Sequence, residues 1–201
     1  MHNVFISYHH DNDQFYKDEL CRLNTQHGIF NDYSVSVGDI SDSLSAEAIR
    51  AKIRDEYLRD STVTIVLVGT ETWGRKHVDW ETYSSMFDGS VNKKSGILVI
   101  KLPSTGCTTY TAPHKYEKEI VHPENTNWMS IDTRAEYDAR YPLMPERIID
   151  NLLKKEALIS VVPWEKIAND PAKLKFLIDA AHNDRSICQY DMSRPMRMRD
   201  A

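Results

Sequence analysis

Cysteine is scarce in this chain of 201 residues, and the three that occur, Cys21, Cys107 and Cys188, are odd in number and widely spaced. Such a set does not form the disulfide framework of a secreted protein, so we expect a reducing compartment. No apolar run approaches the ~20 residues of a membrane-spanning helix. The first residues form neither a basic nor an apolar leader. We therefore expect a cytoplasmic protein without a membrane partner.

An excess of positive charge is also missing, because the formal net charge is −5. A nucleic-acid surface needs clustered Lys and Arg, so we expect no nucleic-acid partner. The only locally basic stretch contains Arg194, Arg197 and Arg199, and we interpret it as a frayed terminus. The length suits one domain. We expect a single domain over residues 1–190, with an insertion at about 103–130 and a C-terminal tail at 191–201.

Several ligand-binding motifs are absent. No G-x-G-x-x-G follows the first predicted strand and no G-x-x-x-x-G-K-[ST] occurs, so neither a dinucleotide redox site nor a phosphate-gripping loop is indicated. Cys107, His114 and His122 match no compact zinc pattern and have no fourth ligand. We therefore expect no metal and no cofactor.

Strand-length apolar runs alternate with helical periodicity along the chain. The predicted strands are 4–8, 33–37 (the weakest), 63–68, 96–102 and 158–162. Helical patterns follow at Tyr16–Leu23, after Ser45, from about His77, after Pro145 and after Asp170. This alternation predicts a flavodoxin-like α/β fold, a doubly wound and mostly parallel five-stranded sheet with helices on both faces.

One predicted helix places a carboxylate beside the central strand, 63–68. Trp80, Tyr83 and Phe87 recur at i, i+3 and i+7, which predicts a helix that packs its aromatic face on this strand. Glu81 lies just off that face. It is near the start of the helix, where the helix dipole favours negative charge.

In an open doubly wound sheet, ligands bind beyond the carboxyl ends of the strands, where the strand order reverses. For the order 2-1-3-4-5, this point lies between the first and third strands. The residues that leave these strand ends are Tyr8, His9, His10 and Asp11 on one side and Thr70, Trp73, His77 and Glu81 on the other. The loop 38–43 and the 103–130 insertion emerge at the same edge, so we expect one pocket there.

Three segments carry a resemblance to a known family: Val4–Tyr8, the strand 63–68, and Arg75–Glu81. Together they resemble a TIR-type domain, and more narrowly the short bacterial TIR-like proteins of the Thoeris antiphage system. The resemblance implies an enzyme that takes NAD as its substrate, releases nicotinamide and makes a linear or cyclic signal from ADP-ribose. It also implies self-association and an effector protein that senses the product.

The same resemblance implies roles for the residues of the predicted pocket. Glu81 falls on the position of the catalytic glutamate, where a carboxylate stabilises positive charge that grows on the ribose. The expected substrate-binding residues are Ser7, Tyr8, His9, Asp39, Trp73 and His77. Tyr8 and Trp73 would stack on nicotinamide, whereas Ser7, His9 or His10 would orient ribose or phosphate. The alternative interpretations are a solvated first-turn glutamate, a packing role for Tyr8, a polar strand end at His9 and turn chemistry at Asp39.

Two other functions remain open. Many TIR domains are non-catalytic interaction modules that assemble through the loop after the second strand, but Gly38–Ser43 is short and polar, without an apolar hot spot. A nucleoside deoxyribosyltransferase-like enzyme would also use a glutamate on a similar sheet, and the strand Phe5–Tyr8 favours a TIR-type domain over it. A phosphorylation receiver would have an aspartate at the end of the third strand, which here ends in Val68–Thr70.

Overall fold

A five-stranded parallel sheet forms the centre of the protein in the computed structural model, which describes residues 1–34, 44–90 and 92–201. The strands are β1 (Asn3–Ser7), β2 (Asn31–Asp32), β3 (Val63–Val68), β4 (Gly96–Lys101) and β5 (Ser160–Pro163). Their order is β2-β1-β3-β4-β5 and every neighbouring pair is parallel. The sheet and its helices confirm the flavodoxin-like α/β fold.

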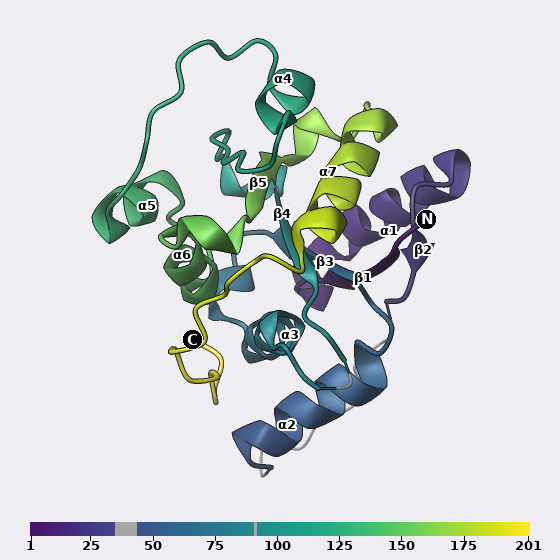
Figure 1. Cartoon of the computed structure of the whole chain (residues 1–201), viewed down its shortest axis with the longest axis vertical. Helices are drawn as coiled ribbons and strands as arrows, with labels where there is room; N and C mark the ends of the chain where they lie inside the picture. The colour runs from purple at the N-terminus through teal and green to yellow at the C-terminus, as the bar shows by residue number, and fades with distance from the viewer. Residues whose placement is uncertain (35–43, 91) are drawn as a thin grey trace.

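Helices lie on both faces of this sheet (Figure 1). They are α1 (His10–His27), α2 (Ala46–Lys52), α3 (Lys76–Met86), α4 (Glu117–Val121), α5 (Arg134–Arg140), α6 (Glu146–Leu152) and α7 (Pro171–Asp184). α1 and α7 share one apolar cluster with the sheet, and α3 and α6 share another. The residues 53–57 extend α2 by a π-helical turn.

The central strand supplies side chains to both apolar clusters. Ile65 and Leu67 point towards α1 and α7, whereas Val66 and Val68 point towards α3 and α6, and all four are at most 1% exposed. Burying each such side chain contributes roughly 1.5–3 kcal/mol. A strand covered on both faces is apolar at every position, which explains why the continuous apolar run predicts β3 so well.

The second strand is shorter and earlier than predicted. Tyr33 and Ser34, the first residues of the predicted strand, lie beyond β2, although the Tyr33 N–H donates to the Val4 carbonyl at 2.9 Å. At Ser34, side-chain hydrogen bonds take the place of backbone pairing between β1 and β2. The Ile6 N–H donates to Ser34 Oγ at 3.1 Å, and the Ser34 N–H donates to Asp32 Oδ1 at 2.8 Å. The predicted positions 35–37 and the loop 38–43, with Asp39, lie outside the described residues.

Helix ends follow local chemistry, with one correction. Gly28 ends α1 in the left-handed region at φ 60°, and Ser45 Oγ caps α2 by accepting from the Ala48 N–H at 3.2 Å. The Asp and Asn residues at positions 11–13 are of types that cap a helix from a preceding loop, but α1 already begins at His10, so they lie in its first turn, and no side chain caps that turn.

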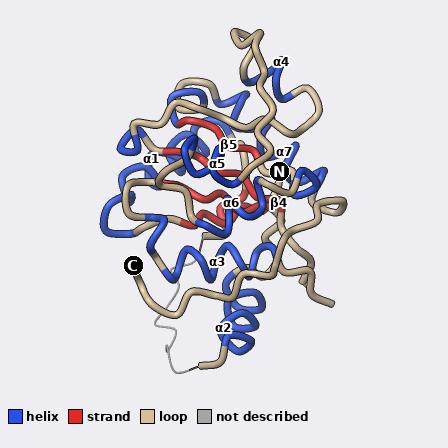
Figure 2. Tube along the Cα trace, turned by 90° about the vertical axis from the view of Figure 1, so that its left-hand side faces the viewer, coloured by secondary structure: helices blue, strands red, loops and turns tan. Residues whose placement is uncertain are grey.

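The C-terminal segment, 191–201, is packed against the protein, so a frayed terminus is wrong. The Trp80 indole N–H donates to the Arg197 carbonyl at 2.6 Å, and Met196 is only 7% exposed. Arg194 forms ion pairs with Glu146 and Asp150 on α6. The segment passes α3 and α6 on its way to the terminus (Figure 2).

The stretch 103–130 contains α4 and one antiparallel bridge, between Thr111 and Val161, which attaches it to the edge of the sheet. From α4 the chain arches away from the sheet before it returns at α5 (Figure 1). Of the helices described, none combines the length and the apolar character needed to cross a bilayer.

Candidate active site

α3 presents small and polar side chains to the sheet. Ser84 and Ser85 are fully buried, and Ser85 Oγ lies 2.8 Å from Thr64 Oγ1 on β3. Glu81 lies one turn earlier on this buried side and is 5% exposed. The carboxylate therefore does not face bulk water. The hydroxyl-sized neighbours let the helix approach the sheet closely enough to bury it.

This arrangement corrects the prediction that the aromatic face of α3 packs on the central strand. Trp80 is fully buried, but its apolar cluster contains Phe5 of β1, Ile49 of α2 and Met196 of the C-terminal segment and no residue of β3. Tyr83 and Phe87 are only half-buried. Trp80 thus packs between β1, α2 and the C-terminal segment, whereas Glu81 and the serines share the buried sides of α3 with Val78 and Met86, which cluster with the sheet.

Glu81 is joined directly to the end of β1. Ser7, the last residue of that strand, is fully buried and donates its hydroxyl to Glu81 Oε2 at 2.6 Å. Burial raises the pKa of Glu81 to about 8, and the Ser7 hydrogen bond opposes this rise. At pH 7 the carboxyl is therefore mostly protonated in the free protein. Positive charge nearby would favour its ionised form.

Tyr8 and His9 follow Ser7 at the same strand end. Tyr8 is half-buried, stacks on His10 with ring centroids 4.4 Å apart, and donates its hydroxyl to Gln14 at 2.7 Å. Burial raises the pKa of Tyr8, and the negative charge of Glu81 adds to the rise. His9 is 8% exposed, and within the described chain its Nδ1 has no hydrogen-bond partner.

Asp13 of α1 is buried beside the same strand ends, a position that the sequence pattern did not predict. Thr72 Oγ1 donates to Asp13 Oδ2 at 3.2 Å and accepts from the Gly69 N–H at 2.9 Å. A Cβ at Gly69 would lie 2.4 Å from Asp13 Oδ1, so only glycine lets α1 approach β3 here. Burial raises the pKa of Asp13. The sequence feature that could have indicated this close approach of α1 is Gly69, which directly follows the predicted central strand.

Trp73 and His77, two of the predicted substrate-binding residues, lie against residues other than Ser7 and Glu81. Trp73 is 42% exposed and lines a cavity of about 230 Å³ together with Arg75, Met196 and other residues of the C-terminal segment. His77 is exposed, with its ring edge-on to Trp80 at 5.1 Å between centroids. Their roles towards a substrate therefore stay predictions, as does that of Asp39.

The three residues considered for zinc each have other contacts. Cys107 Sγ accepts from Lys101 Nζ at 3.0 Å, His114 Nδ1 lies 2.7 Å from Asp184 Oδ2, and His122 stacks on Tyr110. Within the described parts of the chain, no group of three or more His, Cys, Asp or Glu residues is arranged to hold a metal ion.

The parallel sheet in this order, with a buried glutamate on the helix after β3, has the features of a TIR-type domain. The family model described as "Thoeris protein ThsB, TIR-like domain" matches residues 5–106, half of the chain. The protein belongs to this family and is an antiphage protein of the TIR type. The matched range includes both Ser7 and Glu81. No curated protein matches the chain.

Proposed function

We propose that this protein cleaves NAD at the bond between nicotinamide and ribose, with Glu81 as the catalytic residue. The observation that carries the proposal is the buried Glu81 carboxyl at the ends of β1 and β3, held by Ser7 Oγ at 2.6 Å. Membership of the ThsB family supports the same reaction class. A buried, hydrogen-bonded carboxyl with a strongly raised pKa is typical of a functional site.

The chemistry follows from the burial of this carboxyl. When the bond breaks, its electron pair leaves with nicotinamide, and positive charge develops on the ribose. NAD itself carries positive charge on the nicotinamide ring, so its arrival favours the ionised form of Glu81. In a site shielded from water, the carboxylate then stabilises the ribose cation more strongly than a solvated carboxylate would. Ser7 holds the carboxylate oxygen in place during this step.

The fate of the ADP-ribose cation belongs to the same proposal. Attack by water gives linear ADP-ribose, whereas attack by a hydroxyl or ring nitrogen of the same molecule gives a cyclic product. Exclusion of water favours the second outcome. The product would act as the signal for an effector protein, and self-association of this chain would assemble the active form.

The test is to incubate the purified protein with NAD and to measure free nicotinamide by liquid chromatography, with mass spectrometry of the second product. The assay is run at low and high protein concentration, so that a need for self-association is visible. Glu81→Gln preserves size and can still accept the Ser7 hydrogen bond, which makes it the matched control. We expect nicotinamide release by the wild type and a loss of at least about 100-fold in the variant.

Equal release by the wild type and by Glu81→Gln at both concentrations would contradict the proposal. A non-catalytic interaction module would then be the better explanation of the same fold.

A further inference from the structure

A second, larger cavity lies at the edge of the sheet, away from Glu81. Its volume is about 720 Å³, and the residues that line it run from Tyr110 in the insertion to Ile159 before β5. None of them falls within the range that matches the family model, which ends at residue 106. Strand β4 separates β5 from β3, so this cavity is distinct from the strand ends that hold Glu81.

The charge around this cavity is positive, although the protein as a whole is acidic. Lys118, Arg140, Lys154 and Lys155 line it, and no aspartate or glutamate is among the lining residues. Within the described chain, only Lys155 of these four forms an ion pair, with Asp132 at 2.8 Å, and the side chains of both partners are well exposed. Unneutralised cations around one hollow attract an anion.

One of these cations is held in a fixed position. Arg140 is half-buried, and it donates from Nη2 to the Tyr110 carbonyl at 3.0 Å and from Nε to the Tyr141 hydroxyl at 3.4 Å. In the part of the chain that the structure describes, its Nη1 donates to no partner. A guanidinium fixed on one side and open on the other suits a phosphate group.

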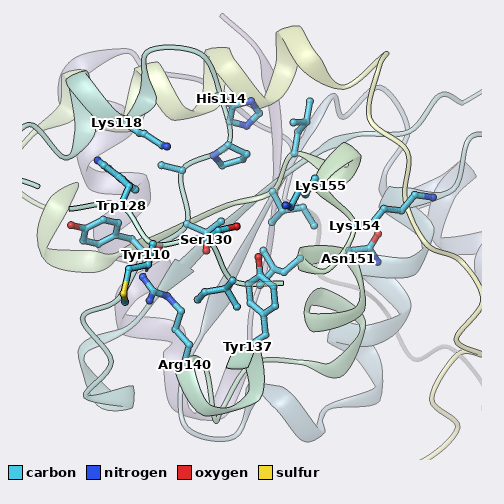
Figure 3. A pocket seen from close by; sticks show the side chains of 18 of the residues that line it. Tyr110, His114, Lys118, Trp128, Ser130, Tyr137, Arg140, Asn151, Lys154 and Lys155 are labelled. Carbon is cyan, nitrogen blue, oxygen red and sulfur yellow. Dashed lines mark hydrogen bonds between the residues drawn. The ribbon is translucent and has the colours of Figure 1, made fainter. Parts of the chain in front are cut away.

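Aromatic side chains form much of the remaining wall. Tyr110 stacks on the fully buried His122 with ring centroids 3.7 Å apart, and Trp128 meets Tyr110 edge-on at 5.6 Å. Lys118 Nζ lies 4.6 Å from the centre of the Trp128 ring. Figure 3 shows Lys118, Trp128, Tyr110 and Arg140 on one side of the cavity and Lys155 on the other. Cations and aromatic rings are thus interleaved along one wall.

We propose that this cavity binds a nucleotide that carries at least two phosphates, with its base on the aromatic wall and its phosphates facing Lys118, Arg140 and Lys155. The volume lies within the ~300–1,000 Å³ of small-molecule sites. Phosphate supplies the negative charge that the cations lack, and a base has the flat apolar surface that Trp128 and Tyr110 can contact. A hollow of this volume suits a small molecule rather than a nucleic-acid strand.

The test measures binding to the full chain by isothermal titration calorimetry, with ADP, pyrophosphate and adenosine as probes. We expect ADP to bind more tightly than either fragment, because only ADP engages both the cations and the rings. Lys118→Ala with Lys155→Ala should weaken ADP binding at least about tenfold. Both residues are exposed, so the fold is preserved. The matched control is Arg59→Ala with Lys93→Ala, which removes two exposed cations elsewhere and should leave binding unchanged.

Trp128→Phe completes the design, because it should abolish the quenching of tryptophan fluorescence that ADP causes. Three outcomes overturn the proposal: no ADP binding at millimolar concentration, pyrophosphate that binds as tightly as ADP, or equal ADP affinity in the Lys118/Lys155 variant and its control. Because binding rather than cleavage is measured, this proposal and the NAD-cleavage proposal can fail independently.

Discussion

At the scale of single residues, Glu81 determines how the protein responds to pH. Its pKa is raised by burial from about 4.5 in the unfolded chain to about 8 in the folded protein. Between these values the folded state holds a proton that the unfolded state releases, so the free energy of unfolding falls as pH rises through this window. A buried carboxyl of this kind costs stability at neutral pH, and function is the usual reason to retain one.

Glu81→Gln should therefore stabilise the protein at neutral and alkaline pH. We expect variant and wild type to have similar stability near pH 4.5, and the advantage of the variant to grow up to about pH 8, by at most ~1.4 kcal/mol for each pH unit. Urea unfolding of both proteins at several pH values measures this difference. A difference that stays constant with pH would mean that Glu81 is ionised in the folded protein throughout.

Ser7 should lower the pKa of Glu81, because its hydroxyl donates to the charged form at 2.6 Å. Ser7→Ala removes this donor, and we expect the pH midpoint of NAD cleavage to move upwards by about one unit, since a hydrogen bond to a charged group contributes roughly 1.5–3 kcal/mol. Ser84→Ala is the matched control. It removes a buried hydroxyl from α3 that has no hydrogen-bond partner in the described chain. A shift of equal size in both variants would count against a specific role for Ser7.

At the scale of elements, the C-terminal segment is fastened to α3 and α6 by one buried ion pair. Arg147 on α6 is 1% exposed, and its Nε and Nη2 donate to the two carboxylate oxygens of Asp79 on α3 at 2.8 and 3.0 Å. Arg147 also donates to the carbonyls of Arg194 and Pro195, and Asp79 accepts from the Arg197 N–H at 2.8 Å. Two helices and the segment therefore share one polar centre.

Asp79→Ala should be strongly destabilising, because it leaves the buried Arg147 guanidinium without its counter-charge. We expect a loss of about 3–5 kcal/mol in the free energy of unfolding, together with faster proteolysis of the segment 191–201. Asp88→Ala is the control, since Asp88 is half exposed and its ion pairs among the described residues are the long ones with Lys93 and Lys94, so its loss should cost under ~1 kcal/mol. Similar losses in the two variants would show that the ion pair does not hold the segment.

The sequence predicted the elements whose neighbours in the chain determine them. β3, α7 and the start of α2 after Ser45 depend on local apolar spacing or on one side-chain hydrogen bond, and all three are confirmed. The packing of the segment 191–201 was missed because it lacks periodicity. Its contacts reach from Arg197 to Trp80 and Asp79, more than one hundred residues away in the chain.

The site was predictable to a similar degree. The rule that ligands bind at the strand ends where the order reverses placed Glu81 beside the end of the first strand, and the structure joins it by a hydrogen bond to Ser7, which only the family resemblance had named. The burial of Asp13 was missed because it depends on the approach of α1 to Gly69, a tertiary contact. The orientation of α3 was wrong because spacing identifies a face but not its neighbour. Trp80 packs against Phe5 of β1 and Ile49 of α2, whereas Ser85 contacts the central strand β3.

At the scale of the whole molecule, the buried carboxyl of Glu81 and the cation-lined cavity lie at separate places along the sheet. Glu81 is held at the end of β1 by Ser7, where its carboxylate can stabilise a forming cation. The cavity between the insertion and α5 and α6 is lined by cations and aromatic rings. β4 and β5 lie between them in the sheet. The first belongs to the part of the chain that defines the family, whereas the second is formed entirely outside it.

The pH dependence of kcat/KM for nicotinamide release tests the central claim, catalysis by a buried Glu81, most directly, because this quantity reports the pKa of the free enzyme. We expect the wild-type value to rise with pH to a plateau with a midpoint near 8, and Glu81→Gln to abolish the activity. A pH-independent rate that persists undiminished in Glu81→Gln would contradict catalysis by Glu81.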